Sequence, residues 1–307
     1  MLTPFENESA MGFCLRTAEA NLVNLHWLRR AVGLSETNQF TSKQVPRLAW
    51  TLQCQQQWLA DAVGQNKLAD GIQEIQWHGH QIYSAGHLRK TWPQVCPKCI
   101  HVFGYCNRLW DLSPVTVCPI HCCPLIDRCL NCKAKLGWDR PGIAICCCKY
   151  SITKKNSEEP SLKSSKVVLA KLLATAVRGE NLDRYVQELG LPKFFIGLSL
   201  GGVLGILDAF GRQEQEFKVQ SASSLIRARP TDDWSEIVDR ALIRLKEFEH
   251  CSEEWLNVGQ LNQNLLYWIL EKTSSPIDAR AAQDLLERVQ QHTPLNRKLR
   301  TNQLPLI

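Results

Sequence analysis

Eight residues of the types that bind soft metal ions stand in four close pairs in the middle of the chain. The pairs are Cys96-x-x-Cys99, Cys118-x-x-His121, Cys129-x-x-Cys132 and Cys146-x-Cys148. Two ligands separated by two residues can hold one ion from a tight turn, and two such turns complete a tetrahedral Cys₄ or Cys₃His zinc site. Because a complete tetrahedron leaves no position for water or substrate, the pattern predicts structural zinc and argues against a zinc enzyme.

Two zinc ions per chain are predicted, each held by two consecutive pairs. This sequential arrangement is favoured because each group of four ligands closes a compact loop at small entropic cost. A cross-braced arrangement, in which the second and third pairs are exchanged, is the alternative. Cys147 stands between Cys146 and Cys148 and could replace either as a ligand, so the fourth pair is less well determined than the other three.

Other roles for these cysteines are weaker interpretations. A disulfide framework needs an oxidising compartment, and Met1–Arg16 lacks the basic and apolar regions of a signal peptide, so we expect a cytoplasmic protein. An iron–sulfur cluster usually takes four cysteines, which His121 does not match. A nucleophilic Cys118 beside His121 is the remaining alternative.

The apolar segments of the chain are too short to cross a membrane, which takes about 18 or more residues. The longest, Phe194–Phe210, contains four glycines and Asp208. We expect it to form a buried pair of helices, and we expect no membrane association.

The net charge of +6 is spread along the chain rather than concentrated. It divides into +1 for residues 1–95, +4 for 96–150 and +1 for 151–307. Two zinc ions and seven thiolate ligands would reduce the central value to +1. The one local excess lies in the tail, at Arg297, Lys298 and Arg300. This charge distribution allows DNA contact but does not require it, because strong autonomous binding rests on clustered phosphate contacts.

The first part of the chain shows short helical patterns with polar N-caps at Ser9 and Asn24. We predict helices from Ser9 to Ala20, from Asn24 to Gly33, over Ser42–Gln53 and over Cys54–Val63, followed by an extended hairpin over Ile72–Ser84. Short helices joined by tight turns are compatible with a helix-turn-helix fold, and equally with another small helical bundle.

The second half of the chain is also predicted to be helical. Residues 151–165 are polar and charged, which indicates a linker. Helices with broad apolar faces are predicted over Thr231–Phe248, with Thr231 as its cap, over Trp255–Glu271, and from Ser275-Pro276 onward.

The predicted fold class is mainly α, with four parts. They are an N-terminal helical, helix-turn-helix-like domain (1–92), a double zinc-binding segment (93–150), a linker (151–165) and a C-terminal helical domain (166–307), which has the length of a second helix-turn-helix-like region.

The order of motifs in the zinc segment resembles the TniQ family of transposition proteins. The motifs are Cys96-Pro-x-Cys99, Tyr105, Arg108-Leu-Trp110, Val115-Thr-Val-Cys118-Pro-x-His121 and Pro124-Leu-x-Asp127-Arg-Cys129-x-x-Cys132. Glu8-Ser9, Phe13, Arg16, Ala18 and Asn21 fit the opening pattern of the family. One departure is Lys149, which follows the last pair where the family commonly has Gly.

The resemblance implies a non-catalytic target-selection adapter of Tn7-like transposons. Such an adapter links a target-recognition complex, which is an RNA-guided effector in CRISPR-associated transposons, to the AAA+ ATPase regulator that recruits the transposase. The alternative within the family is an autonomous DNA-binding target selector. Those proteins carry additional C-terminal DNA-binding domains, for which 307 residues leave little room, and so we favour the adapter.

An adapter must hold two partners, and the chain has two helical ends. The N-terminal module is predicted to face the ATPase regulator, and the C-terminal half to serve the effector or a second copy of the chain in a homodimer. We expect DNA contacts to be weak or partner-assisted, with Arg29 and Arg30 on the second helix as exposed candidates. Their alternative role is that of helix-end charges that interact with the macrodipole.

Overall fold

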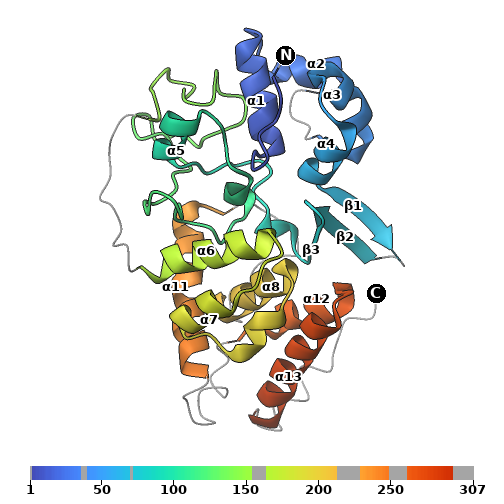
Figure 1. Ribbon diagram of the computed structural model, residues 1–307, viewed down its shortest axis with the longest axis vertical. Coiled ribbons are helices and arrows are strands. Elements are labelled where there is room, and N and C mark those ends of the chain that lie inside the picture. Colours follow the sequence, from blue (N-terminus) through green and yellow to red (C-terminus); the bar gives the residue numbers. More distant parts are fainter. Residues whose placement is uncertain are drawn as a thin grey trace.

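Helices form most of the computed structural model, which describes residues 2–35, 40–69, 72–153, 164–212, 229–248 and 261–292. The N-terminal helices and the zinc segment make up the upper part of the molecule in Figure 1, and helices α6 to α13 make up the lower part. The predicted mainly α fold with a cysteine-rich centre is confirmed. Within the described ranges, no helix has both the length and the apolar character needed to span a bilayer.

The first two N-terminal helices begin where the sequence predicts, and the third and fourth begin three and two residues later than predicted. They are α1 (Ala10–Ala20), α2 (Leu25–Ala31), α3 (Val45–Leu52), which follows a 3₁₀ turn at Ser42–Gln44, and α4 (Gln56–Val63). The Ser9 hydroxyl accepts a hydrogen bond from the Gly12 N–H at 3.1 Å, and the Asn24 side chain accepts one from the Trp27 N–H at 2.9 Å. Each cap satisfies an N–H group that the helix itself leaves unpaired.

Helices α3 and α4 are joined by only three residues, among which Gln53 has a positive φ of 51°. A turn of this length is typical of a helix-turn-helix unit. An antiparallel sheet follows, with strands β1 (Gln65–Ala69), β2 (Ile72–Trp77) and β3 (His80–Ile82) in sequential order. Ile75 pairs with Ile82 in the β2–β3 hairpin, which confirms the predicted extended hairpin, whereas β1 was not predicted.

The zinc segment contains little regular structure. Helix α5 (Pro97–Phe103) and a 3₁₀ turn at Arg108–Asp111 are followed by a series of tight turns up to residue 153. Of the predicted linker, residues 154–163 lie outside the described ranges, and helix α6 begins at Ser165.

The C-terminal helices surround α8, whose residues are all buried. They are α6 (Ser165–Val177), α7 (Asp183–Leu189), a 3₁₀ turn at Lys193–Gly197, α8 (Leu200–Gly211), α11 (Thr231–Phe248), α12 (Gln263–Lys272) and α13 (Pro276–His292). Glycine lets α8 approach the sheet, because a Cβ on Gly201 would lie 2.3 Å from the Gln81 carbonyl oxygen. The prediction of two helices over Phe194–Phe210 is wrong, because this range contains a 3₁₀ turn followed by a single helix, α8.

Two of the sequence predictions fall partly or wholly outside the described residues. The predicted helix over Trp255–Glu271 includes residues 255–260, which are not described, and α12 begins at Gln263. The basic tail residues Arg297, Lys298 and Arg300 are not described either.

A single cluster of buried apolar residues extends from Ala10 in α1 to Val289 in α13. Buried polar contacts reinforce the junction between residues 80–90 and the C-terminal helices. The Tyr83 hydroxyl donates to the Asp278 carboxylate at 2.6 Å, and His87 lies 3.1 Å from the carboxylate of Asp208 on α8. The N-terminal and C-terminal halves are thus packed together rather than joined only by a linker.

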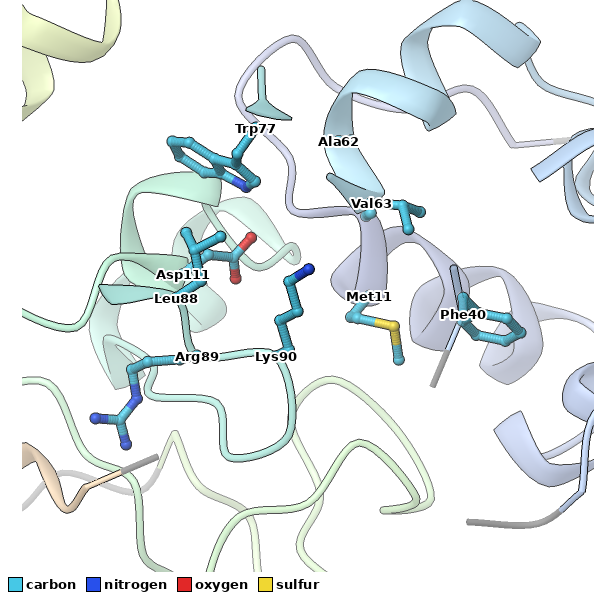
Figure 2. A pocket seen from close by; sticks show the side chains of 10 residues that line it. Met11, Phe40, Ala62, Val63, Trp77, Leu88, Arg89, Lys90 and Asp111 are labelled. Atoms are coloured by element: carbon cyan, nitrogen blue, oxygen red, sulfur yellow. The ribbon is translucent and has the colours of Figure 1, made fainter. Parts of the chain in front are cut away.

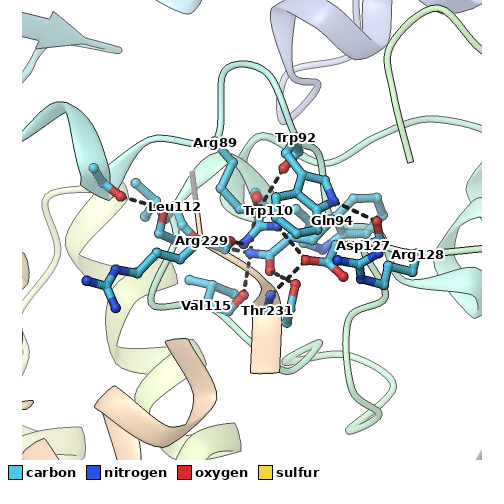
Figure 3. A network of polar contacts seen from close by, with 12 residues as sticks. Arg89, Trp92, Gln94, Trp110, Leu112, Val115, Asp127, Arg128, Arg229 and Thr231 are labelled. Carbon is cyan, nitrogen blue, oxygen red and sulfur yellow. Dashed lines mark hydrogen bonds and ion pairs between the residues drawn. The ribbon is translucent and has the colours of Figure 1, made fainter. Parts of the chain in front are cut away.

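Asp127, between the second and third ligand pairs, fixes the start of α11 (Figure 3). Its Oδ2 accepts hydrogen bonds from Arg89 Nη2 at 2.9 Å and from the Thr231 N–H at 2.7 Å. The Thr231 hydroxyl donates to Gln94 Oε1 at 2.9 Å. The prediction that Thr231 caps its own helix is therefore wrong, because α11 begins at Thr231 itself and the Asp127 carboxylate accepts from this first N–H of the helix.

Gln94 extends this network into the zinc segment. Its side-chain amide lies within hydrogen-bonding distance of three backbone carbonyls, those of Trp110 at 3.2 Å, Leu112 at 3.1 Å and Val115 at 2.6 Å. Gln94 is buried together with Arg89 and Asp127, so these polar groups rely on one another for their hydrogen bonds.

Replacement of Asp127 by alanine should strongly destabilise the protein. The change leaves the buried Arg89 guanidinium and the Thr231 N–H without their acceptor, and removal of one partner of a buried ion pair costs about 3–5 kcal/mol. Urea unfolding measures the change. Glu180→Ala is the control, because it removes the exposed ion pair with Arg178 and should leave the free energy of unfolding almost unchanged. Equal stability of the two variants would contradict this role of Asp127.

Candidate metal centre

The structure brings the eight predicted ligand residues together in two groups. Cys96, Cys99, Cys118 and His121 form the first tetrad, and Cys129, Cys132, Cys146 and Cys148 form the second. Within each tetrad, all four ligand atoms lie within 4.8 Å of one another. This is the sequential grouping, not the cross-braced one.

The first tetrad is mostly buried. The Sγ atoms of Cys99 and Cys118 are 3.6 Å apart, and His121 Nδ1 lies 3.1 Å from Cys99 Sγ and 3.6 Å from Cys96 Sγ. With zinc–sulfur bonds of 2.3 Å, a regular tetrahedron places its sulfur atoms about 3.8 Å apart. The donor set and its spacing therefore fit a zinc ion.

The second tetrad has similar spacing but is more open to solvent. Cys129 Sγ lies 3.7 Å from Cys148 Sγ, and Cys132 Sγ lies 3.8 Å from Cys146 Sγ. Cys132 and Cys148 are exposed, whereas all three cysteines of the first tetrad are buried. Cys147 is exposed and lies outside the tetrad, although its Sγ is 3.7 Å from that of Cys146.

The backbone of each turn supports the ligand atoms. The Cys99 N–H donates to Cys96 Sγ at 3.4 Å, and the His121 N–H donates to Cys118 Sγ at the same distance. The Tyr150 N–H lowers the pKa of the Cys148 thiol to about 6. These donors stabilise the thiolate, which is the form that binds metal.

Three of the four turns share a backbone feature that sequence reasoning did not identify. The residue that follows the second ligand is Cys122, Lys133 or Lys149, and its φ is +49°, +58° or +63°, respectively. The left-handed region is favoured by glycine. This explains why glycine suits the position after the last pair, and Lys149 adopts the same conformation in its place.

Cys123 is a fourth thiol, beside the three thiols and the imidazole of the first tetrad. Its Sγ lies 3.5 Å from Cys96 Sγ, and it is buried. Hydrogen bonds from Cys118 and Cys123 hold the pKa of the Cys96 thiol well below its ordinary value. The sequence does not identify this neighbour, because spacing along the chain does not show that the turn brings Cys123 back toward Cys96.

The predicted nucleic-acid contacts at Arg29 and Arg30 differ in exposure. Arg30 is exposed, but Arg29 is buried and its guanidinium forms an ion pair with Asp139 of the zinc segment. The expectation that Arg29 is exposed is therefore wrong. Nearby, the Ile143 N–H donates a hydrogen bond to the carboxylate of Glu19 on α1 at 2.9 Å. Both contacts attach the second tetrad to the N-terminal helices.

One cavity outside the tetrads contains ionisable groups. Lys90 and Asp111 lie among apolar residues such as Met11 and Trp77 (Figure 2), and burial raises the pKa of Asp111 to about 8. The cavity volume is about 40 Å³, enough for only one or two water molecules. A perturbed carboxyl group in a cleft is a common sign of catalysis, but this space is too small for a substrate.

Fold and site define a mainly helical protein with two Cys/His tetrads suited to metal ions such as zinc. Residues 1–125 match the TniQ family. The chain therefore carries a TniQ family domain over these residues, which confirms the resemblance for this part of the chain. The first tetrad lies within the matched residues, and the second lies beyond them. A comparison with curated proteins found no match.

We expect two zinc ions per chain, measurable by elemental analysis of the purified protein. Cys99→Ala should reduce the content to one ion and unfold the first tetrad, because structural zinc contributes directly to folding. Cys147→Ser is the matched control and should retain both ions. Loss of one ion from Cys147→Ser would show that Cys147 is a ligand, and wild-type protein with one zinc or none would contradict the two-site assignment.

The pH dependence of stability should reveal the buried Asp111 carboxyl group. Its pKa is raised from 3.8 to about 8, mainly because burial disfavours the charged form. Between these values the folded state binds more protons than the unfolded state, so the free energy of unfolding should fall as pH rises toward 8. Asp111→Asn removes the titrating group and should flatten this dependence. The free energy of unfolding of both proteins is measured with urea from about pH 6 to 8.5, where the metal ligands keep zinc. The same pH dependence in wild type and Asp111→Asn would contradict this assignment.

Proposed function

We propose that this chain is a non-catalytic adapter in Tn7-like transposition. It links a target-recognition complex, an RNA-guided CRISPR effector, to the AAA+ ATPase regulator that recruits the transposase. The observation that carries the proposal is the TniQ domain over residues 1–125, which contains a metal tetrad with four protein ligands. Such a tetrad supplies rigidity rather than chemistry, because a catalytic zinc site keeps one position open for water or substrate.

The packing between the halves supports an adapter role. An adapter that positions two partners must keep its two binding surfaces at a fixed distance and orientation. The Arg89–Asp127–Thr231 contacts join the zinc segment to α11, and the Tyr83–Asp278 contact joins the β3 region to α13. These buried contacts resist relative movement of the N-terminal and C-terminal surfaces.

A groove on the N-terminal helices is a candidate surface for the ATPase regulator. It has a volume of about 320 Å³ and lies between α1, α2 and α3, where Ala18, Trp27 and Leu52 are among its lining residues. Trp50, on the same helix as Leu52, is 82% exposed. Exposed tryptophans are frequent anchors of protein–protein interfaces.

Exposed apolar side chains also occur on the C-terminal helices, at Ile243 on α11 and Ile277 on α13. We assign this end to the target-recognition complex, with a second copy of the chain as the other candidate partner. The buried faces of α11 and α13 are used in the internal core, so an interface at this end would use outer side chains such as these two.

The second candidate function is an autonomous DNA-binding target selector. The short turn between α3 and α4 favours it, and so do Gln55, Gln56 and Gln57, which are exposed at the start of α4. Glutamine can read adenine in the major groove from such a position. Nanomolar binding to one defined site at physiological salt, without partners, would favour this function over the adapter.

Pull-down of the full-length chain with each partner tests the adapter model. Trp50→Glu should abolish capture of the ATPase regulator and retain capture of the effector, because it places a charge on the N-terminal surface alone. Ile243→Glu combined with Ile277→Glu should have the opposite effect. Trp50→Phe keeps an aromatic side chain and serves as the control. The reverse pattern would exchange the two assignments, and no capture of either partner by wild-type protein would refute the adapter model.

A further inference from the structure

The charges of the zinc segment are distributed unevenly once the fold is taken into account. All three acidic residues between 96 and 150 are engaged within the protein. Asp111 lines the small cavity, Asp127 binds Arg89 and Thr231, and Asp139 is paired with Arg29. Asp127 is buried, Asp111 faces the small cavity, and Asp139, although its side chain is 60% exposed, is compensated by Arg29, which a count along the sequence does not reveal.

Four cations around the second tetrad are exposed instead. We call Arg128, Lys133, Lys135 and Lys149 the basic rim. None of them forms an ion pair with a carboxylate in the described parts of the chain. With zinc bound, four thiolates give the tetrad a charge of about −2, so the rim and tetrad together keep about +2.

Three of the rim residues are held in place by the turn that carries Cys129 and Cys132. Arg128 and Lys135 are opposite each other in an antiparallel bridge. Arg128 Nη1 donates to the Lys133 carbonyl at 3.2 Å, and Lys133 Nζ donates to the Leu130 carbonyl at 2.8 Å. The tetrad fixes this turn, so the cations are presented together rather than on independent flexible loops.

The ring of Trp92 lies beneath two of the rim cations. Arg128 and Lys135 lie 5.1 Å and 4.2 Å from its centroid. Trp92 itself is only 6% exposed, and its indole N–H donates to the Asp127 carbonyl at 2.7 Å. The ring therefore orients the cations but offers no free face on which an unpaired base could stack.

We propose that the basic rim is a binding surface for the phosphate backbone of duplex DNA. Lysine and arginine contact phosphates without reading sequence, and a surface without an exposed aromatic platform suits a duplex better than a single strand. An acidic protein is a poorer fit, because protein interfaces centre on clusters of apolar anchors. Among the described residues 129–148, Ile145 is the single large apolar side chain that is exposed, at 36%. The choice of DNA over duplex RNA rests on the proposed function in transposition.

Titration of full-length protein with a random-sequence DNA duplex over a series of salt concentrations tests the rim. Each phosphate contact contributes about 0.9 to the slope of log K against log salt. Simultaneous change of Arg128, Lys133, Lys135 and Lys149 to Gln should make the slope shallower by about 3.6 and weaken binding about tenfold or more at low salt. Zinc content and far-UV circular dichroism should match the wild type.

The matched control removes the same number of positive charges from the other end of the molecule. Arg184, Lys193, Lys246 and Arg280 are exposed on the C-terminal half, and their change to Gln should leave the slope and affinity unchanged. An equal loss of affinity and slope in both variants would show that net charge, not the basic rim, determines binding, and would contradict the proposal. An unchanged slope in the rim variant would also overturn it.

Competitors identify the class of ligand. Duplex DNA should displace the labelled duplex at lower concentration than single-stranded DNA, duplex RNA or polyglutamate. Stronger competition by any of these three would assign the rim to that class instead and refute the proposal. The assay uses no transposition partner, so its failure is separate from failure of the adapter model, in which capture of the partners is measured.

Discussion

The fold depends on one buried carboxylate, that of Asp127, which joins two parts of the molecule. It accepts hydrogen bonds from Arg89, before the zinc segment, and from the first N–H of α11, about a hundred residues later in the chain. A carboxylate at this depth is costly unless its partners are in place. The turns that carry the metal ligands place it, because Asp127 lies between His121 of the first tetrad and Cys129 of the second. The metal centre and the interface between the halves are therefore parts of one structure.

Because of this coupling, the metal tetrads do more than cross-link the turns that contain them. The zinc segment has little helix or strand of its own, so its turns need cross-links to hold their shape. Contacts from Arg29 to Asp139 and from Ile143 to Glu19 attach the second tetrad to the N-terminal helices. Contacts through Gln94 and Asp127 attach the segment to α11. A central body fixed on both sides is the property that an adapter needs to hold two partners in a constant relation.

Much of the fold could be predicted from local pattern. Ligand spacing identified the eight metal-binding candidates, and the polar caps at Ser9 and Asn24 located two helices, because spacing and capping are set by neighbours in the chain. Contacts between distant residues could not be found in this way. Three features depend on pairing that leaves no local signature. They are the burial of Arg29, the hydrogen bond from the Thr231 N–H to the Asp127 carboxylate, and strand β1 of the sheet. Lys149 shows the same limit, since its positive φ follows from the turn rather than from its residue type.

Hydrogen–deuterium exchange before and after removal of zinc tests the central claim most directly. If the tetrads hold Asp127 in position, removal of zinc should increase amide exchange in residues 96–150. It should also increase exchange in the first turn of α11, where the Thr231 N–H donates to Asp127. Protection in α13, where Asp278 accepts hydrogen bonds from Tyr83 and from the Ser199 N–H and not from the metal-binding turns, should fall less. Loss of protection confined to the zinc segment, with α11 unchanged, would contradict the account and show that the tetrads stabilise only their own turns.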